Sequence, residues 1–140
     1  MTLTARTQYA CLAMSHLAAE RGAREPTPLR AIAERHGIPA TFLVQILNQL
    51  KRAGLVVSER GAGGGYRLKK PPGEISLAEV AEAIEPADAP TCAAARSPLS
   101  GAMIALAQQL QAARRACLAE WTLADMVARA AAGGEPMWYI

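Results

Sequence analysis

The 140-residue sequence is poor in aromatic residues and has no long apolar run. Aromatic residues make up only 4% of the chain, although apolar residues make up 51%. The core must therefore consist mainly of Ala, Leu, Ile and Val, which pack well between helices. No run of about 18 apolar residues is present, and the N-terminus lacks the pattern of a signal peptide. We expect a cytoplasmic, helix-rich chain with no membrane span.

The sequence also has few cysteines and no evident catalytic group. Cys11, Cys92 and Cys117 lie far apart and form no C-x-x-C pair. This arrangement fits neither the disulfide framework of a secreted protein nor a usual zinc site, so we expect reduced thiols. No nucleophile, base and orienting acid cluster around His16 or His36. We therefore do not expect an enzyme.

The first half of the chain has the apolar spacing of three helices. The first covers about residues 4–20. The second has Thr27 as its N-cap and Pro28 at its first position, and Gly37 ends it. The third covers residues 40–53, and its predicted inward stripe consists of Phe42, Ile46, Leu47 and Leu50. Two helices joined by a short turn with glycine predict a helix-turn-helix.

A glycine-rich hairpin is expected after the third helix. Residues 55–60 and 66–69 have the composition of strands, and residues 61–65 read Gly-Ala-Gly-Gly-Gly. A competing interpretation is a phosphate-binding loop, but such a loop opens into a helix, whereas a strand follows here. The hairpin therefore predicts a wing, and the fold class is mainly α with a small two-stranded β wing, a winged helix-turn-helix.

Two capping patterns divide the second half of the chain. Ser76 and Glu79 predict a capping box at the start of a fourth helix, and Thr122 and Asp125 resemble a second one before a final helix. Prolines between them favour an irregular loop over residues 86–100.

The longest predicted helix, residues 101–121, has a narrow apolar seam. Residues recur along it at steps of three and four, namely Met103, Leu106, Leu110, Ala113, Cys117 and Glu120. The seam can pair with the same helix of a second subunit, or it can pack onto the winged-helix body of its own chain. The pattern leaves both arrangements open.

Charge is unevenly distributed around the predicted wing. Residues 51–70 have a net charge of +5, because six basic residues face only Glu59: Lys51, Arg52, Arg60, Arg67, Lys69 and Lys70. Residues 71–90 have five acidic residues and no Lys or Arg. Such segregation indicates a polyanion-binding surface, although a solvated charged face gives the same pattern.

The outward side of the third helix offers candidate contacts to DNA. An α-helix fits the major groove, where Gln45 can pair with adenine through two hydrogen bonds. Arg60 at the wing tip can enter the minor groove, where guanidinium groups are attracted to narrow A·T tracts. The predicted contact set is Thr27, Ala40, Thr41, Val44, Gln45, Asn48, Lys51, Arg52, Arg60, Gly63 and Tyr66. An ordinary surface helix and hairpin remain the alternative.

These elements together resemble a known family. The chain is similar to the bacterial regulators that include IscR, NsrR and CymR in Thr4, residues 8–10, 32–38, 50–56, 60–68, 74–80 and 121–126. The resemblance implies a homodimer held by the long helix, recognition helices in adjacent major grooves and wing arginines in the minor groove. Val44 stands where IscR-like members often have an acidic residue, so a different base preference is expected.

The resemblance also raises the question of a sensor. Many members bind an iron-sulfur cluster through three cysteines in the loop before the long helix, and only Cys92 is present here. Gln8 and His36 occupy positions where other members have further ligands. This ligand set is incomplete. If no cluster is bound, His36 is expected to be charged and to complement the dipole at the end of its helix. Cys92 is then expected to be either a thiol open to reversible oxidation or an inert one.

Four segments are therefore expected. They are a DNA-binding domain (1–72), a capped helix with a sensor-type loop (73–100), a dimerisation helix (101–121) and a C-terminal helix with tail (122–140). The expected function is a DNA-binding transcription regulator, a repressor acting as a homodimer, that responds to redox state or an iron-sulfur cluster. The alternative is a protein-interaction module that keeps the winged helix without reading DNA.

Overall fold

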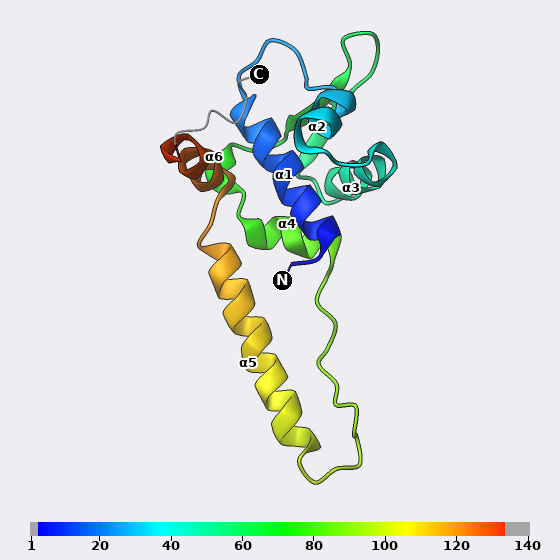
Figure 1. Ribbon diagram of the computed structural model, residues 1–140, viewed down its shortest axis with the longest axis vertical. Coiled ribbons are helices and arrows are strands. Elements are labelled where there is room, and N and C mark those ends of the chain that lie inside the picture. The colour runs from blue at the N-terminus through cyan, green and yellow to red at the C-terminus, as the bar shows by residue number, and fades with distance from the viewer. Residues whose placement is uncertain (1–2, 134–140) are drawn as a thin grey trace.

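The structure, a computed structural model, describes residues 3–133. Over this range the elements are α1 (Ala5–Ala19), α2 (Leu29–His36), α3 (Ala40–Arg52), β1 (Val56–Glu59), β2 (Gly65–Leu68), the 3-10 helix η1 (Pro72–Glu74), α4 (Leu77–Ile84), α5 (Ser100–Ala119) and α6 (Leu123–Ala132). Figure 1 shows a compact body from which α5 projects as a long arm. The mainly α class with a two-stranded wing is confirmed. Residues 134–140 of the expected C-terminal segment lie outside the described residues.

Helix α1 runs through the middle of the body and packs against α3, α4 and α6. Thr4 caps its N-terminus, because the Thr4 hydroxyl oxygen accepts a hydrogen bond from the Thr7 backbone N–H at 3.2 Å. Ala10, Ala13 and Met14 are fully buried along its length. These alanines allow the neighbouring helices to approach closely, which explains how a core so poor in aromatic residues fills its volume.

Helices α2 and α3 form the expected helix-turn-helix. Gly37 ends α2 in the left-handed conformation, with φ 65°, which glycine adopts without steric cost. On α3, one face is fully buried and consists of Leu43, Ile46, Leu47 and Leu50. The prediction that Phe42 belongs to this stripe is wrong, because Phe42 is 45% exposed. Leu43 rather than Phe42 completes the i, i+3, i+4, i+7 spacing of one helix face.

The wing is a β-hairpin that is joined to the segment before α2. Strands β1 and β2 pair antiparallel with Val56 opposite Leu68. Thr27 extends this sheet: its N–H donates to the Tyr66 carbonyl at 3.0 Å, and the Tyr66 N–H donates to the Thr27 carbonyl at 2.8 Å. The expectation that Thr27 caps α2 is therefore wrong. Pro28 occupies the N-cap, with no side-chain cap.

Helices α4 and α6 are fixed to each other at their N-terminal ends. Ser76 and Thr122 form a β-bridge, and each accepts a hydrogen bond from a backbone N–H of its own helix. The capping box of Thr122 and Asp125 is confirmed in full. Only half of the other expected box is present, because the Glu79 carboxylate forms an ion pair with Lys70 at 3.2 Å instead of returning to the Ser76 N–H.

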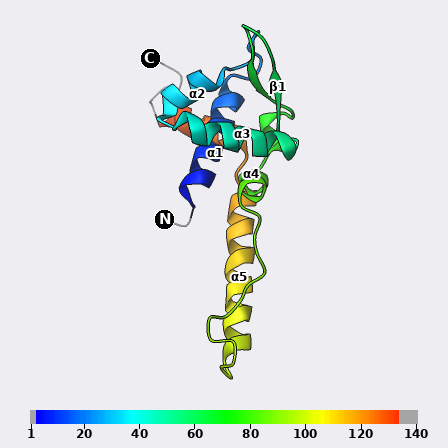
Figure 2. The ribbon, with the colours of Figure 1, turned by 90° about the vertical axis from the view of Figure 1, so that its right-hand side faces the viewer.

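Helix α5 leaves the body and has no buried residue in this chain. As Figures 1 and 2 both show, the irregular loop after α4 runs alongside α5 to its far end. The Gln111 side chain donates to the Asp88 carbonyl at 2.9 Å and ties this loop to the helix. Packing of the whole seam onto the body of its own chain is thus excluded by the structure. No helix within residues 3–133 has the length and apolar character to cross a bilayer.

Candidate nucleic-acid interface

The solvent-facing side of α3 contains the predicted base-contacting residues. The opposite side of the helix is buried. The five exposed residues are Ala40, Thr41, Val44, Gln45 and Asn48. Phe42 joins this face near the start of the helix, and its ring lies 6.5 Å from that of Tyr9. Phe42 was not predicted to face outward, because its spacing from Ile46 also fits the buried stripe. The result is a mixed apolar and amide surface, which is suited to thymine methyl groups and base edges.

A basic edge continues from the end of α3 to the wing tip. Lys51, Arg52 and Arg60 are exposed, and so is Gly63 in the turn. In Figure 1 both α3 and the wing lie on the right-hand side of the body, and in Figure 2, which faces that side, the wing rises beside one end of α3. The helix and the wing therefore lie on one side of the molecule.

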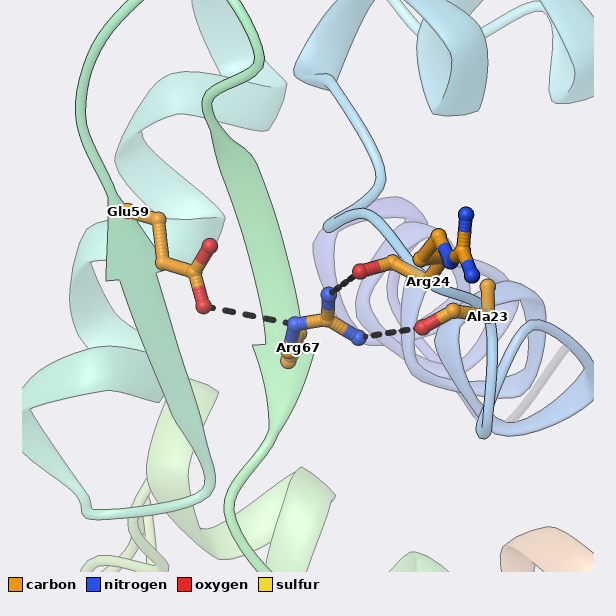
Figure 3. A network of polar contacts seen from close by, with 4 residues as sticks. All are labelled: Ala23, Arg24, Glu59 and Arg67. Atoms are coloured by element: carbon orange, nitrogen blue, oxygen red, sulfur yellow. Dashed lines mark hydrogen bonds and ion pairs between the residues drawn. The ribbon is translucent and has the colours of Figure 1, made fainter.

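The wing is held in place by Arg67, which Figure 3 shows between the two strands and the α1–α2 loop. Its guanidinium donates to the carbonyls of Ala23 at 2.8 Å and Arg24 at 2.7 Å, and it pairs with Glu59 at 3.3 Å. Arg67, which the sequence places in the basic patch, is therefore bound to other groups of the same chain. Lys70 is used similarly against Glu79. Two of the six basic charges of residues 51–70 are therefore paired with carboxylates of the same chain, although both side chains stay partly exposed.

Two residues of the predicted contact set lie mainly inside the molecule. Thr27 is buried, and Tyr66 is half-buried against the core. Their backbones form the bridge that joins the wing to the segment before α2. Both residues therefore hold the wing in position through their backbones. Contact of either residue with DNA stays a prediction.

The candidate sensor residues lie on three separate elements. Gln8 on α1 donates its side-chain N–H to the Leu3 carbonyl at 2.9 Å. Cys92 is half-buried in the loop before α5. No group of three or more His, Cys, Asp or Glu side chains within residues 3–133 is arranged to hold a metal ion.

His36 has an unexpected partner on α1. Its Nε2 lies 2.9 Å from Nδ1 of His16, and the two rings meet edge to face. Burial, the neighbouring His36 and the charge of Arg35 lower the pKa of His16 from 6.5 to about 4. Burial and Arg35 also lower the pKa of His36. The expectation that His36 is charged to complement the helix dipole is therefore wrong, because its surroundings favour the neutral ring.

The remaining cysteines differ in accessibility. Cys11 is buried in the core, and burial raises the pKa of its thiol to about 11. Such a thiol is protonated at neutral pH and chemically inert. Cys117 is exposed on α5, so its own chain does not cover this position of the apolar seam.

The fold and the exposed surface define a winged helix-turn-helix domain with an appended helical arm. The pattern of the Rrf2 family, described as "Iron-dependent Transcriptional regulator", matches residues 3–129, and the chain belongs to this family.

Curated relatives and solved structures agree with this assignment. The chain is 45% identical over 95 residues to the HTH-type transcriptional regulator IscR of Aliivibrio salmonicida, covering 66% of this chain and 55% of the relative. It is 44% identical over 95 residues to IscR of Cronobacter sakazakii, covering 66% of this chain and 57% of the relative. The chain thus spans little more than half the length of these relatives.

The structural likeness extends over nearly the whole chain. CymR, the global cysteine regulator of B. subtilis, superposes with a TM-score of 0.77 at 28% identity, covering 92% of this chain and 98% of CymR. IscR of T. potens superposes with a TM-score of 0.75 at 27% identity, covering 100% of this chain and 93% of that IscR. The arm is therefore part of the shared fold.

Proposed function

We propose that this protein is a transcription regulator that binds duplex DNA as a homodimer, with α3 in the major groove and the wing in the minor groove. The observation that supports this most directly is the exposed face of α3 lying on the same side of the body as the basic wing tip. Family membership and the regulatory functions for which IscR and CymR are named support it further. A regulator of this kind acts on the chromosome, so the proposal includes a cytoplasmic location.

The proposed contacts follow the position of each residue on α3 and the wing. Residues in the first turns of α3, including Thr41, Val44 and Gln45, face the base edges. Lys51 and Arg52, at the far end of the helix, bind phosphates, which position the protein without reading sequence. Arg60 enters the minor groove. Arg67 fixes the angle of the wing from behind, through its contacts to the α1–α2 loop.

The proposed dimer is held by α5. Met103, Leu106 and Leu110 lie on this helix and are between 48% and 63% exposed in the isolated chain. An apolar stripe of this kind in water marks an interaction surface. Pairing of two α5 helices about a twofold axis buries both stripes and places two copies of α3 on one duplex, as a symmetric operator requires.

DNA binding is tested with duplexes selected from a random library. Affinity is measured by fluorescence anisotropy at several salt concentrations, for the wild type and for the variants Lys51→Ala and Arg60→Ala. Each variant is expected to bind about tenfold more weakly and to lower the salt slope by about one, because each removes one contact to the charged duplex. Arg96→Ala, an exposed arginine in the loop before α5, is the matched control and is expected to bind like the wild type. Absence of salt-dependent binding by the wild type to any duplex would refute the proposal in favour of a protein-interaction module.

A further inference from the structure

An arginine on α1 contacts the recognition helix from the side. The Arg6 Nη1 donates to Gln45 Oε1 at 3.3 Å, and its Nη2 donates to Gln49 Oε1. The two glutamines lie one turn apart on α3, so one guanidinium bridges both. Gln45 is exposed on the proposed DNA-binding face, whereas Arg6 and Gln49 are half-buried beside it. Arg6 belongs to none of the contacts that the sequence indicated.

The chemistry of the guanidinium determines which end of the Gln45 amide faces outward. Arginine has five N–H donors and no acceptor, so the amide atom that it contacts must be the oxygen. The Gln45 NH₂ group is then directed away from Arg6. A glutamine that reads adenine by two hydrogen bonds needs its oxygen to accept from adenine N6 while its NH₂ donates to N7. Arg6 takes one of the two lone pairs of the Gln45 oxygen and lies on that side of the amide, so the outward end of Gln45 that DNA meets is the NH₂ donor.

We propose that Arg6 determines base specificity by orienting Gln45, so that each recognition helix presents an amide donor to an acceptor on a base edge. Guanine offers two such acceptors in the major groove, O6 and N7, and thymine offers O4, whereas adenine offers only N7, beside an N6 donor that an outward-facing NH₂ group does not satisfy. This inference rests on the proposed DNA-binding function and changes one expectation from the sequence, namely that Gln45 pairs with adenine through both ends of its amide. Arg6 acts here as a positioning residue that does not itself read a base.

A direct phosphate contact is the competing role for Arg6, and the two roles differ in what a substitution changes. Loss of a phosphate contact weakens binding equally for all sequences and lowers the salt slope by about one. Loss of a positioning contact changes the preference at one base pair in each half-site and leaves the salt slope unchanged. Base preference and salt dependence together therefore distinguish the roles.

The test uses the full chain and selection from a randomised duplex library. The wild type, Arg6→Met, Arg6→Lys, Gln45→Ala and the double variant Arg6→Met/Gln45→Ala are compared. The base pair that Gln45 reads is the one at which Gln45→Ala loses its preference. At this pair we expect the wild type to prefer guanine or thymine, and Arg6→Met to reduce that preference about tenfold, with adenine gaining. Adding Arg6→Met to Gln45→Ala should change nothing further, because the two residues act through one contact.

Arg6→Lys keeps the charge but cannot bridge both glutamines with a planar fork. It should keep the wild-type salt slope and show an intermediate base preference, and it supplies the comparison if Arg6→Met fails to fold by circular dichroism. An unchanged preference in Arg6→Met, or a uniform loss of affinity with a lower salt slope, would overturn the inference while leaving DNA binding intact. Selection of no site by the wild type would instead refute the proposed function.

Discussion

The histidine pair between α1 and α2 is expected to make the fold sensitive to acid. His16 is 5% exposed, and its Nδ1 lies 2.9 Å from His36 Nε2 at the end of α2. In this geometry one neutral ring donates a hydrogen bond and the other accepts it. Protonation of both rings would remove the acceptor and place two positive charges side by side, next to Arg35. We therefore expect the helix-turn-helix to lose stability as the pH falls below 6.5.

The direction and the size of this loss of stability follow from the pKa of His16, which is lowered from 6.5 to about 4 in the folded chain. Between these values the unfolded chain binds more protons than the folded chain, so the free energy of unfolding falls as the pH falls. The contribution of His16 is intact above pH 6.5. About 2 kcal/mol is lost between pH 7 and pH 5, and about 3 kcal/mol by pH 4. The lowered pKa of His36 acts in the same direction.

Urea unfolding followed by circular dichroism at pH 7.0, 6.0 and 5.0 measures this loss. Protein concentration is held constant because self-association contributes to apparent stability. The matched variant is His16→Asn, whose amide keeps a polar atom near Nδ1 but does not titrate in this range. We expect the wild type to lose about 2 kcal/mol or more over this range, and the variant to lose much less. A flat wild-type profile, or equal slopes for both proteins, would refute the reasoning.

Two further predictions concern the wing and the arm. A Cβ at Gly65 would lie 2.3 Å from the Thr27 carbonyl oxygen, so Gly65→Ala should destabilise the chain by about 2 to 3 kcal/mol in urea unfolding. Gly63→Ala, where a Cβ meets nothing within 4 Å, is the control, and equal effects would contradict the packing argument. Leu110→Glu should raise the dimer dissociation constant at least about tenfold in sedimentation equilibrium, because each subunit loses a leucine that the proposed dimer buries. Gln109→Glu, which alters the adjacent position on α5, should leave the dimer intact, and dimers of unchanged strength in Leu110→Glu would exclude the proposed interface.

Local signals in the sequence were sufficient to predict the order of the α-helices and strands, although not the 3-10 helix η1. Glycine and proline mark the ends of α2 and of the strands, and the predicted strands differ from β1 and β2 by one residue at each end. The errors occur where two local patterns compete. Phe42 and Leu43 both fit helical spacing toward Ile46 and Leu47, and only the packing of α3 on the body decides between them. Thr27 is a good N-cap residue, but its backbone is already paired with Tyr66, far away in the sequence.

The polar contacts that shape the candidate interface could not be predicted for a related reason. Arg6 and Gln45 are 39 positions apart, and Arg67 is 44 positions from Ala23. Such contacts depend on how helices cross and which rotamers then meet, and neither leaves a periodic signal in the sequence. Counting charges therefore treats Arg60 and Arg67 alike, although one is exposed at the wing tip and the other is hydrogen-bonded to the α1–α2 loop. Because the same wing contains both, replacing Arg60 should change how DNA is bound, whereas replacing Arg67 should change whether the wing is in position to bind it.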